Sequence, residues 1–253
     1  SDELSKAEQR GLTGIAVVGR ACTTSTGSFD DVQAIGNFCQ KNKLWVHVDG
    51  AHGAANGPSA KYRHLVSGLE LADSVTLDFH KMLMTPAITS ALLFREGHKS
   101  YGSFAQQADY LWSESDSPEW FNLAKRTFEC TKTMLSVKVS SIVATHGWEL
   151  FDQNVTRLND LAAGFAELLD AANDFELAIA PQTNIVCFRY TAGTGNTCDV
   201  NKKARQKLLE RGEFYIVQTV LNGETWLRTT ISNPMTQPIH FEELLTAIRS
   251  VAS

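Results

Sequence analysis

The stretch that decides the fold runs from position 47 to position 55 and reads His47-Val48-Asp49-Gly50-Ala51-His52-Gly53-Ala54-Ala55. It follows directly on the apolar run that begins at Leu44, which predicts a buried strand. An acid at the end of such a strand, followed by small residues, is typical of the carboxyl edge of an open α/β sheet, where ligands bind. The small residues allow a flat ligand to approach the backbone closely. The stretch therefore predicts an α/β fold with a ligand site at this edge.

The sequence before this strand predicts a strand and a helix. Residues 13–19 form an apolar run that predicts a buried strand, and apolar residues recur with helical spacing from Val32 to Cys39. Ser28 and Asp31 resemble a helix-capping pair. The short connections favour parallel pairing of the two strands, so we expect a strand–helix–strand unit.

The sequence after this unit predicts a second region of different character. Further elements are expected as strands at 74–78 and 90–94, a polar loop at 97–121, helices at 123–146 and 151–172, strands at 175–179, 184–190, 214–221 and 225–230, and helices at 200–211 and 241–251. Asn222-Gly223 between two strands predicts a hairpin. We expect part of a large α/β domain over residues 1–147 and a small α+β domain over residues 148–253.

The composition is that of an ordinary globular protein. The 253 residues include 23 basic and 28 acidic side chains, a net charge of −5, and 43% are hydrophobic, which excludes the fibrous, disordered and small disulfide-framework classes. The mild acidity argues against a nucleic-acid or anionic-membrane partner. Five widely spaced cysteines without a Cys-x-x-Cys pair favour a reduced, cytoplasmic compartment. No apolar run approaches the ~20 residues of a membrane helix.

A second motif adds a lysine to the predicted edge. Asp78-Phe79-His80-Lys81 follows another predicted strand, so Lys81 is expected on the same edge as Asp49. This pair suits a pyridine cofactor, because a carboxylate keeps the ring nitrogen of pyridoxal phosphate protonated and thereby electron-withdrawing. An amine forms a Schiff base with the aldehyde of the same cofactor. Asp49 and Lys81 supply these two functions.

These residues also have simpler structural explanations. An acid at a strand end often caps the following turn, and a His-Lys pair is typical of a solvated loop. His47 is compatible with a hydrogen-bonded interior histidine. A metal site at His47 and His52 is disfavoured, because no third ligand with suitable spacing follows. We therefore predict no metal.

The Asp49 segment, the His80-Lys81 pair and the stretch Trp226-Leu227-Arg228-Thr229-Thr230-Ile231-Ser232-Asn233-Pro234 together resemble the group II pyridoxal-phosphate-dependent amino-acid decarboxylases. This family includes the glutamate, aromatic-L-amino-acid, cysteine-sulfinate and 2,4-diaminobutyrate decarboxylases. The resemblance extends over nearly all 253 residues. It implies the aspartate-aminotransferase-like fold, called fold type I, and a homodimer.

The resemblance also implies which residues hold the cofactor. Lys81 would form the Schiff base, and His80 would lie close to the cofactor phosphate. Asp49 would bind the pyridine nitrogen, and Ala51 would pack on the face of the ring. Thr24 matches a threonine on the side of the ring hydroxyl.

Two further residues match positions that act on the substrate. Tyr110 has the spacing of the mobile-loop tyrosine that protonates the substrate carbon after carbon dioxide leaves. Arg228 matches an arginine that holds a substrate carboxylate, where a bidentate guanidinium fixes orientation better than lysine. Asp78 stands where many relatives carry asparagine, and an extra carboxylate there would repel a phosphate unless it is paired or points elsewhere.

The implied activity is decarboxylation of an L-amino acid, such as 2,4-diaminobutyrate, glutamate or a similar polar acid, to an amine and carbon dioxide. Two alternatives stay open: a carbon–carbon lyase or oxidative deaminase on the same apparatus, and a catalytically incompetent fragment or silent partner subunit. Members of the family carry about as much sequence again before this region. We therefore expect a fragment, a processed chain or a chain whose partner carries the other half, and weak binding of pyridoxal phosphate by this chain alone.

Overall fold

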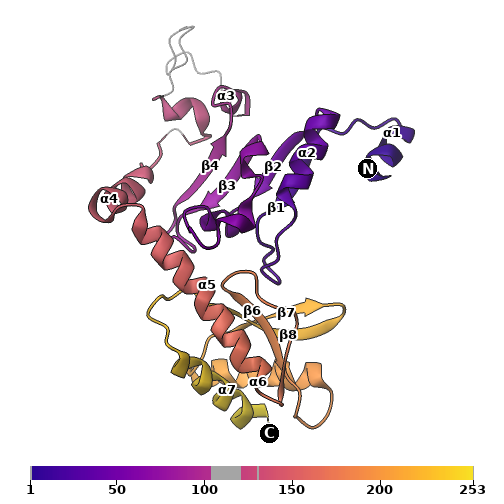
Figure 1. The fold of residues 1–253 in the computed structure, drawn as a ribbon, viewed down its shortest axis with the longest axis vertical. Coiled ribbons are helices and arrows are strands. Elements are labelled where there is room, and N and C mark those ends of the chain that lie inside the picture. Colours follow the sequence, from indigo (N-terminus) through magenta and orange to yellow (C-terminus); the bar gives the residue numbers. More distant parts are fainter. Residues whose placement is uncertain (1, 104–120, 130, 253) are drawn as a thin grey trace.

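The computed structural model describes residues 2–103, 121–129 and 131–252. These residues form two four-stranded sheets, separated in the sequence by the long helix α5 (Glu149–Asp170) (Figure 1). The first sheet is largely parallel and the second is antiparallel, and helices accompany both. The predicted α/β class is confirmed.

The first sheet has the strand order β1-β2-β3-β4. Strands β1, β2 and β3 are mutually parallel, and β4 is antiparallel to β3. The bounds are β1 Ala16–Arg20, β2 Trp45–Asp49, β3 Ser74–Asp78 and β4 Ser90–Phe94. Because parallel strands end on the same side, Arg20, Asp49 and Asp78 mark one edge of the sheet, called here the carboxyl edge.

Helix α2 (Val32–Asn42) covers one face of this sheet. Its N-cap is Asp31, whose carboxylate accepts a hydrogen bond from the Ala34 amide at 2.9 Å. The expected capping partner Ser28 instead bonds the Thr26 hydroxyl at 2.8 Å. The interface of helix and sheet consists of buried apolar side chains, among them Val32, Cys39, Val46 and Val48.

The other face of the first sheet is open over β1, so the predicted burial of the first strand is wrong. Val18 is 59% exposed and Ile15, just before the strand, is 81% exposed. Arg20, Asp49 and Leu92 belong to one row that crosses this face, and all three are exposed. Parallel sheets are normally covered on both faces, so this surface is unusual for the fold.

Short helices and turns connect the remaining parts. Their bounds are α1 Asp2–Gln9, η1 Gly53–Asn56, η2 Arg63–Val66, η3 Leu69–Leu71, α3 Lys99–Ser103, η4 Leu123–Arg126 and α4 Ser136–His146. The predicted continuous helix over 123–146 is therefore wrong in its first half. The Thr127 hydroxyl accepts a hydrogen bond from the Glu129 amide at 3.2 Å, a local bond that competes with helix formation.

The second sheet has the order β5-β6-β8-β7 and is antiparallel throughout. The bounds of its strands and helices are β5 Phe175–Leu177, β6 Ile185–Tyr190, β7 Val217–Leu221, β8 Glu224–Thr230, α6 Thr197–Arg211 and α7 Pro238–Ala252. The hairpin predicted at Asn222-Gly223 is confirmed, with φ angles of 52° and 81° that suit a tight turn between β7 and β8.

Helix α5 packs its apolar stripe against the second sheet and α7 (Figure 1). The stripe recurs every three to four residues, as a helix with one buried face requires, and comprises Phe151, Val155, Leu158, Ala162, Phe165 and Leu169. Phe165 stacks on Phe241 and meets Phe188 edge to face, which joins helix, sheet and α7 in one core. Within the described residues, no helix has the length and apolar character of a membrane span.

Candidate active site

Backbone hydrogen bonds join the loops at the carboxyl edge. The Ala21 amide donates to the Asp49 carbonyl at 2.9 Å, and the Gly53 amide donates to the Ala21 carbonyl at 3.0 Å. The Asp78 amide donates to the Ala51 carbonyl at 3.2 Å. The segments that carry the predicted acid and the predicted lysine are therefore bonded directly to each other.

Two glycines allow these loops to approach so closely. A Cβ atom on Gly53 would lie 2.3 Å from the Ala21 carbonyl oxygen, and a Cβ atom on Gly50 would lie 2.9 Å from the Thr76 carbonyl oxygen. Both of these oxygens are backbone atoms, which have no other rotamer to adopt. The small residues noticed in the sequence thus serve the packing of the edge itself.

Asp49 lies at the last position of β2 and is exposed. Its Oδ1 accepts a hydrogen bond from the Ala51 amide at 3.2 Å, so the carboxylate caps its own turn, as the simpler explanation expects. Its exposure leaves the carboxylate accessible to a ligand as well. Ala51 is partly exposed beside it.

Lys81 lies in the turn after β3, and its Nζ is 2.7 Å from Asp78 Oδ2. The Ser90 hydroxyl donates to the other oxygen of Asp78. Burial alone would raise the pKa of Asp78, but the hydrogen bonds from Lys81 and Ser90 outweigh it and hold the pKa below its usual value. The extra carboxylate noted in the sequence is therefore paired with the predicted coenzyme lysine.

His80 closes the loop that follows Lys81. Its Nδ1 lies 2.9 Å from the carbonyl oxygen and 3.1 Å from the amide nitrogen of Thr89. The Phe79 amide also donates to the Thr89 carbonyl, at 2.9 Å. One ring nitrogen of His80 thus has a structural partner in the loop.

Three predicted charged residues influence the ionisation of the Cys22 thiol. Burial raises the pKa of Cys22 to about 12, while the charges of Arg228 and Lys81 act to lower it and that of Asp49 acts to raise it. Lys81, Asp49 and Arg228, which lie on different loops and sheets, therefore all act on the ionisation of one buried thiol.

Arg228 comes from β8 of the second sheet, in register with Cys187 of β6. Its Nε is buried and has no hydrogen-bond partner among the described residues, and burial lowers the pKa of the guanidinium. A buried donor without a partner is costly, and a guanidinium pairs best with a carboxylate or phosphate. Arg228 also lines a cavity of about 470 Å³. This arrangement suits an anionic ligand.

The structure gives no contact between Thr24 and this group among the described residues. Thr24 is exposed in a turn whose neighbouring hydroxyls, those of Thr23, Thr26 and Ser28, bond one another. Tyr110 lies outside the described residues.

His47 has a hydrogen-bonded environment of its own. Nδ1 lies 2.8 Å from the Ser74 hydroxyl and Nε2 lies 3.3 Å from the Thr76 hydroxyl. This arrangement matches the interior histidine expected from the sequence. In the part of the chain that the structure describes, no group of three or more His, Cys, Asp or Glu side chains is placed to hold a metal ion.

Sequence reasoning missed a contact between the two sheets. Nε2 of His52, in the loop after β2, lies 2.7 Å from Oδ1 of Asn184, which directly precedes β6. Asn184 is fully buried. The only signal in the sequence is an amide at the start of an otherwise apolar strand.

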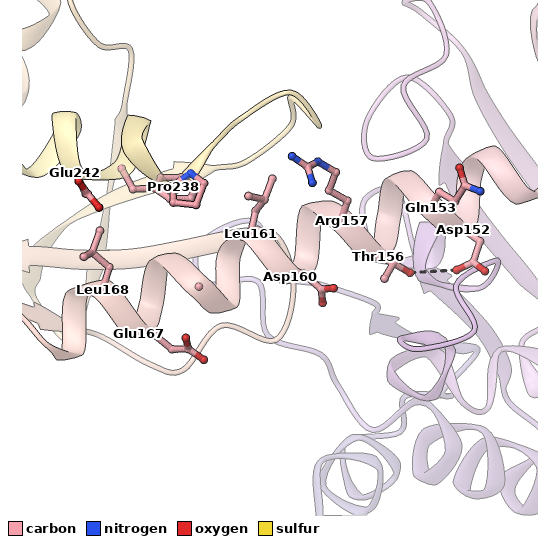
Figure 2. Close-up of a pocket in the computed structure, with 12 residues that line it drawn as sticks. Asp152, Gln153, Thr156, Arg157, Asp160, Leu161, Glu167, Leu168, Pro238 and Glu242 are labelled. Carbon is pink, nitrogen blue, oxygen red and sulfur yellow. Dashed lines mark hydrogen bonds between the residues drawn. The ribbon is translucent and has the colours of Figure 1, made fainter.

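A separate cavity of about 840 Å³ lies along α5 beside the start of α7. Figure 2 shows Leu161, Leu168 and Pro238 along it, with Asp152, Asp160 and Glu167 also on α5. The Thr156 hydroxyl donates to Asp152 at 3.1 Å, drawn as a dashed line. None of the predicted site residues lines this cavity.

A comparison of the sequence with known protein families identifies a family whose coenzyme fits the residues of the carboxyl edge. The pyridoxal-dependent decarboxylase conserved domain matches residues 2–191. The chain belongs to this family. Its decarboxylase relatives include an L-2,4-diaminobutyrate decarboxylase of Rhizobium meliloti, which is 31% identical over 99% of this chain and 51% of the relative. An L-aspartate decarboxylase of Metarhizium robertsii is 30% identical over 88% of this chain and 48% of the relative.

A solved decarboxylase structure has the same fold. The glutamate decarboxylase domain of a diaminobutyrate-pyruvate transaminase and L-2,4-diaminobutyrate decarboxylase from Vibrio parahaemolyticus superposes with a TM-score of 0.83 and 28% identity, over 99% of this chain and 49% of that one. The predicted fold type I is confirmed. The chain spans about half the length of the decarboxylases that it matches.

The residues of the carboxyl edge fit the coenzyme of this family. Lys81 offers an amine and Asp49 offers an accessible carboxylate; on the second sheet, the Nε of Arg228, which has no hydrogen-bond partner among the described residues, offers a donor for an anion. When bound, pyridoxal phosphate withdraws electrons from the substrate carbon that loses its carboxylate.

Proposed function

We propose that this chain provides the lysine and the arginine of a pyridoxal-phosphate-dependent decarboxylase that converts an L-amino acid to an amine and carbon dioxide. The observation that carries this proposal is the direct bond between the loops that carry Asp49 and Lys81, from the Asp78 amide to the Ala51 carbonyl at 3.2 Å. The substrate class is a polar amino acid such as 2,4-diaminobutyrate, glutamate or aspartate. The names of similar relatives support this class.

Each residue of the edge has a proposed task in binding the coenzyme. Lys81 anchors it covalently, and Asp49 keeps the pyridine nitrogen protonated, because an adjacent carboxylate favours the charged form of a base. His80 lies beside the phosphate, Ala51 packs on the ring, and Thr24 approaches the ring hydroxyl. The direct bonding of the two loops supports this division of tasks.

Arg228 and Tyr110 have proposed tasks toward the substrate. The guanidinium of Arg228 holds a substrate carboxylate and so fixes which bond of the α-carbon stands perpendicular to the coenzyme ring. That orientation selects loss of carbon dioxide over loss of a proton. Tyr110 returns a proton to the same carbon. The unpartnered buried Nε of Arg228 supports its part of this proposal.

The open face of the first sheet supports a further proposal about assembly. We infer that the half of the decarboxylase fold that the relatives have and this chain does not contain covers the row of Arg20, Asp49 and Leu92. That half also completes the phosphate site, and the assembled enzyme is a homodimer. Within this chain, the proposed division lies between residues 1–147, part of the coenzyme domain, and residues 148–253, the small domain. The widely spaced cysteines favour a cytoplasmic location.

Product analysis of the assembled enzyme tests the proposed reaction. The chain is produced together with the other half of its fold, incubated with pyridoxal phosphate and each candidate amino acid, and assayed for carbon dioxide and amine in equal amounts. Aldehyde with ammonia in place of amine would establish an oxidative deaminase, and carbon–carbon cleavage without carbon dioxide would establish a lyase. Activity that persists in Lys81→Ala would identify this chain as a silent partner.

A further inference from the structure

A buried chain of polar side chains connects the carboxyl edge with the second sheet. Asn56 Nδ2 donates to the Gly53 carbonyl at 2.9 Å, and Asn159 Nδ2 of α5 donates to Asn56 Oδ1 at 2.7 Å. The Thr183 hydroxyl lies 3.1 Å from Asn159 Oδ1 and 3.2 Å from Asn184 Oδ1. Their side chains come from η1, α5 and the segment before β6, and each of the four polar residues is at most 3% exposed. We call Asn56, Asn159, Thr183 and Asn184 the asparagine chain.

The end of the asparagine chain fixes the tautomer of His52. Asn184 Nδ2 donates to the Ile231 carbonyl at 2.8 Å, so the other atom of this amide, Oδ1, must be an acceptor. His52 Nε2 lies 2.7 Å from that Oδ1 and therefore carries the proton. The Ile231 amide donates in turn to the Asn184 carbonyl at 2.8 Å. One side chain thus binds both the loop after β2 and the segment after β8.

The charges around His52 favour its neutral form. Burial lowers the pKa of the imidazole, and the cations Lys81 and Arg228 act in the same direction. The hydrogen bond to Asn184 and the charge of Asp78 act the other way, but the net shift is downward. The lowered pKa favours an uncharged His52 that donates to Asn184.

We propose that His52 and Asn184 are positioning residues for the substrate carboxylate. Their hydrogen bond holds Arg228, three residues before Ile231, in place relative to the edge that carries Asp49 and Lys81. The inference rests on the proposed function for the role of Arg228. It predicts that loss of the bond misplaces the guanidinium and weakens substrate binding, while the coenzyme residues of the first sheet keep their positions.

Two substitutions of His52 separate the hydrogen bond from the ring. His52→Gln keeps an N–H donor at the place of Nε2, and His52→Phe keeps a planar ring without a donor. In the assembled decarboxylase, we expect His52→Phe to raise KM about tenfold, the effect of one lost hydrogen bond, with coenzyme affinity unchanged. We expect His52→Gln to retain the wild-type KM and kcat. An unchanged KM in His52→Phe, or a rise of KM in His52→Gln as large as in His52→Phe, would overturn the proposal.

A matched pair of asparagine variants excludes a general effect on folding. Asn201 of α6 is also fully buried, and its side chain bonds Tyr190 and Thr197 far from the carboxyl edge. Both Asn184→Ala and Asn201→Ala should lower the unfolding temperature, but only Asn184→Ala should raise KM. Equal changes in KM would show a merely structural role and contradict the proposal.

Nitrogen NMR of protein with ¹⁵N-labelled histidine tests the His52–Asn184 hydrogen bond without any catalytic assay. We expect the neutral form of His52 to carry its proton on Nε2, and His52 to be less charged at about pH 6 than an ordinary histidine. A neutral form with its proton on Nδ1 alone would refute the inference. If the wild-type enzyme neither binds the coenzyme nor releases carbon dioxide, the proposed function fails, and this measurement still decides whether the His52–Asn184 bond exists.

Discussion

The ammonium of Lys81 lies 2.7 Å from the carboxylate of Asp78, three residues earlier in the same turn. The side chain of Asp78 is 13% exposed and that of Lys81 is 38% exposed, so the pair is accessible at the lysine end. Lys81 must leave Asp78, at least in part, when it reacts with an aldehyde. The ion pair therefore restrains the proposed anchoring amine until the coenzyme arrives and has to be broken before the amine reacts.

Replacing this carboxylate should change how fast the lysine reacts. In Asp78→Asn the ion pair is absent, and no negative charge opposes the phosphate. We therefore expect the coenzyme to react with Lys81 about two- to fivefold faster, because a partly exposed ion pair contributes only a small free energy. Stopped-flow absorbance measures the rate. Ser90→Ala, which keeps the charge, is the control and should react at nearly the wild-type rate. A slower reaction in Asp78→Asn would contradict this role of the pair.

The same ion pair predicts a pH dependence of stability. The pKa of Asp78 is lowered in the folded chain, although burial opposes the shift, because the bonds from Lys81 and Ser90 outweigh it. A lowered pKa stabilises the fold above the unfolded value of about 3.9 and ceases to do so as the pH falls through the folded pKa. The difference in unfolding free energy between wild type and Asp78→Asn should therefore be positive at pH 7 and shrink below about pH 4. A difference that stays constant down to about pH 2 would exclude this linkage.

Gly53 tests the close packing of the carboxyl edge. An added Cβ atom would lie 2.3 Å from the Ala21 carbonyl oxygen, so Gly53→Ala should destabilise the fold by about 1–3 kcal/mol. A Cβ atom added at Gly164, in the middle of α5, would meet no neighbouring atom within 4 Å, so Gly164→Ala should be neutral or stabilising by about 0.5–1 kcal/mol. Urea unfolding measures both. Equal effects of the two substitutions would contradict the packing described for the edge.

Arg228 tests the binding of the substrate carboxylate. We expect Arg228→Lys to raise KM about tenfold or more, because lysine cannot form the bidentate pair and a charged hydrogen bond is worth about 1.5–3 kcal/mol. Coenzyme affinity should be unchanged, since Arg228 lies on the second sheet. Arg189→Lys is the matched control, because Arg189 lies on the same sheet but pairs with Glu176 and Glu224. A normal KM in Arg228→Lys would remove Arg228 from the site.

Much of the fold can be predicted from periodicity alone, and the failures have physical causes. Strands β3 and β4 have the bounds expected from their apolar runs. Helix α1 escapes prediction because none of its residues is buried, so it has no apolar stripe to detect. The helix expected over 123–146 fails in its first half, where Thr127, Thr131 and Thr133 gather, since β-branched residues lower helix propensity and Thr127 bonds its own loop.

Residues of the candidate site can be predicted from the sequence only where they belong to a recognisable motif. Asp49, Lys81 and Arg228 can be chosen because acid, amine and guanidinium have recognisable chemistry, although their shared influence on the buried Cys22 depends on the tertiary structure. The pairing of Asp78 with Lys81 also depends on the turn geometry rather than on residue type. His52 and Asn184 lie 132 positions apart, and no local pattern links them. Contacts between the two sheets could not be predicted from the sequence alone.

The most direct test of the anchoring role of Lys81 is reduction of the protein with borohydride in the presence of pyridoxal phosphate, followed by peptide mass mapping. We predict a single dominant modification at Lys81, absent in Lys81→Ala and weaker in Asp49→Asn, while the exposed Lys61 stays unmodified at equal coenzyme concentration. Modification spread over surface lysines, with no preference for Lys81, would contradict the proposed coenzyme site.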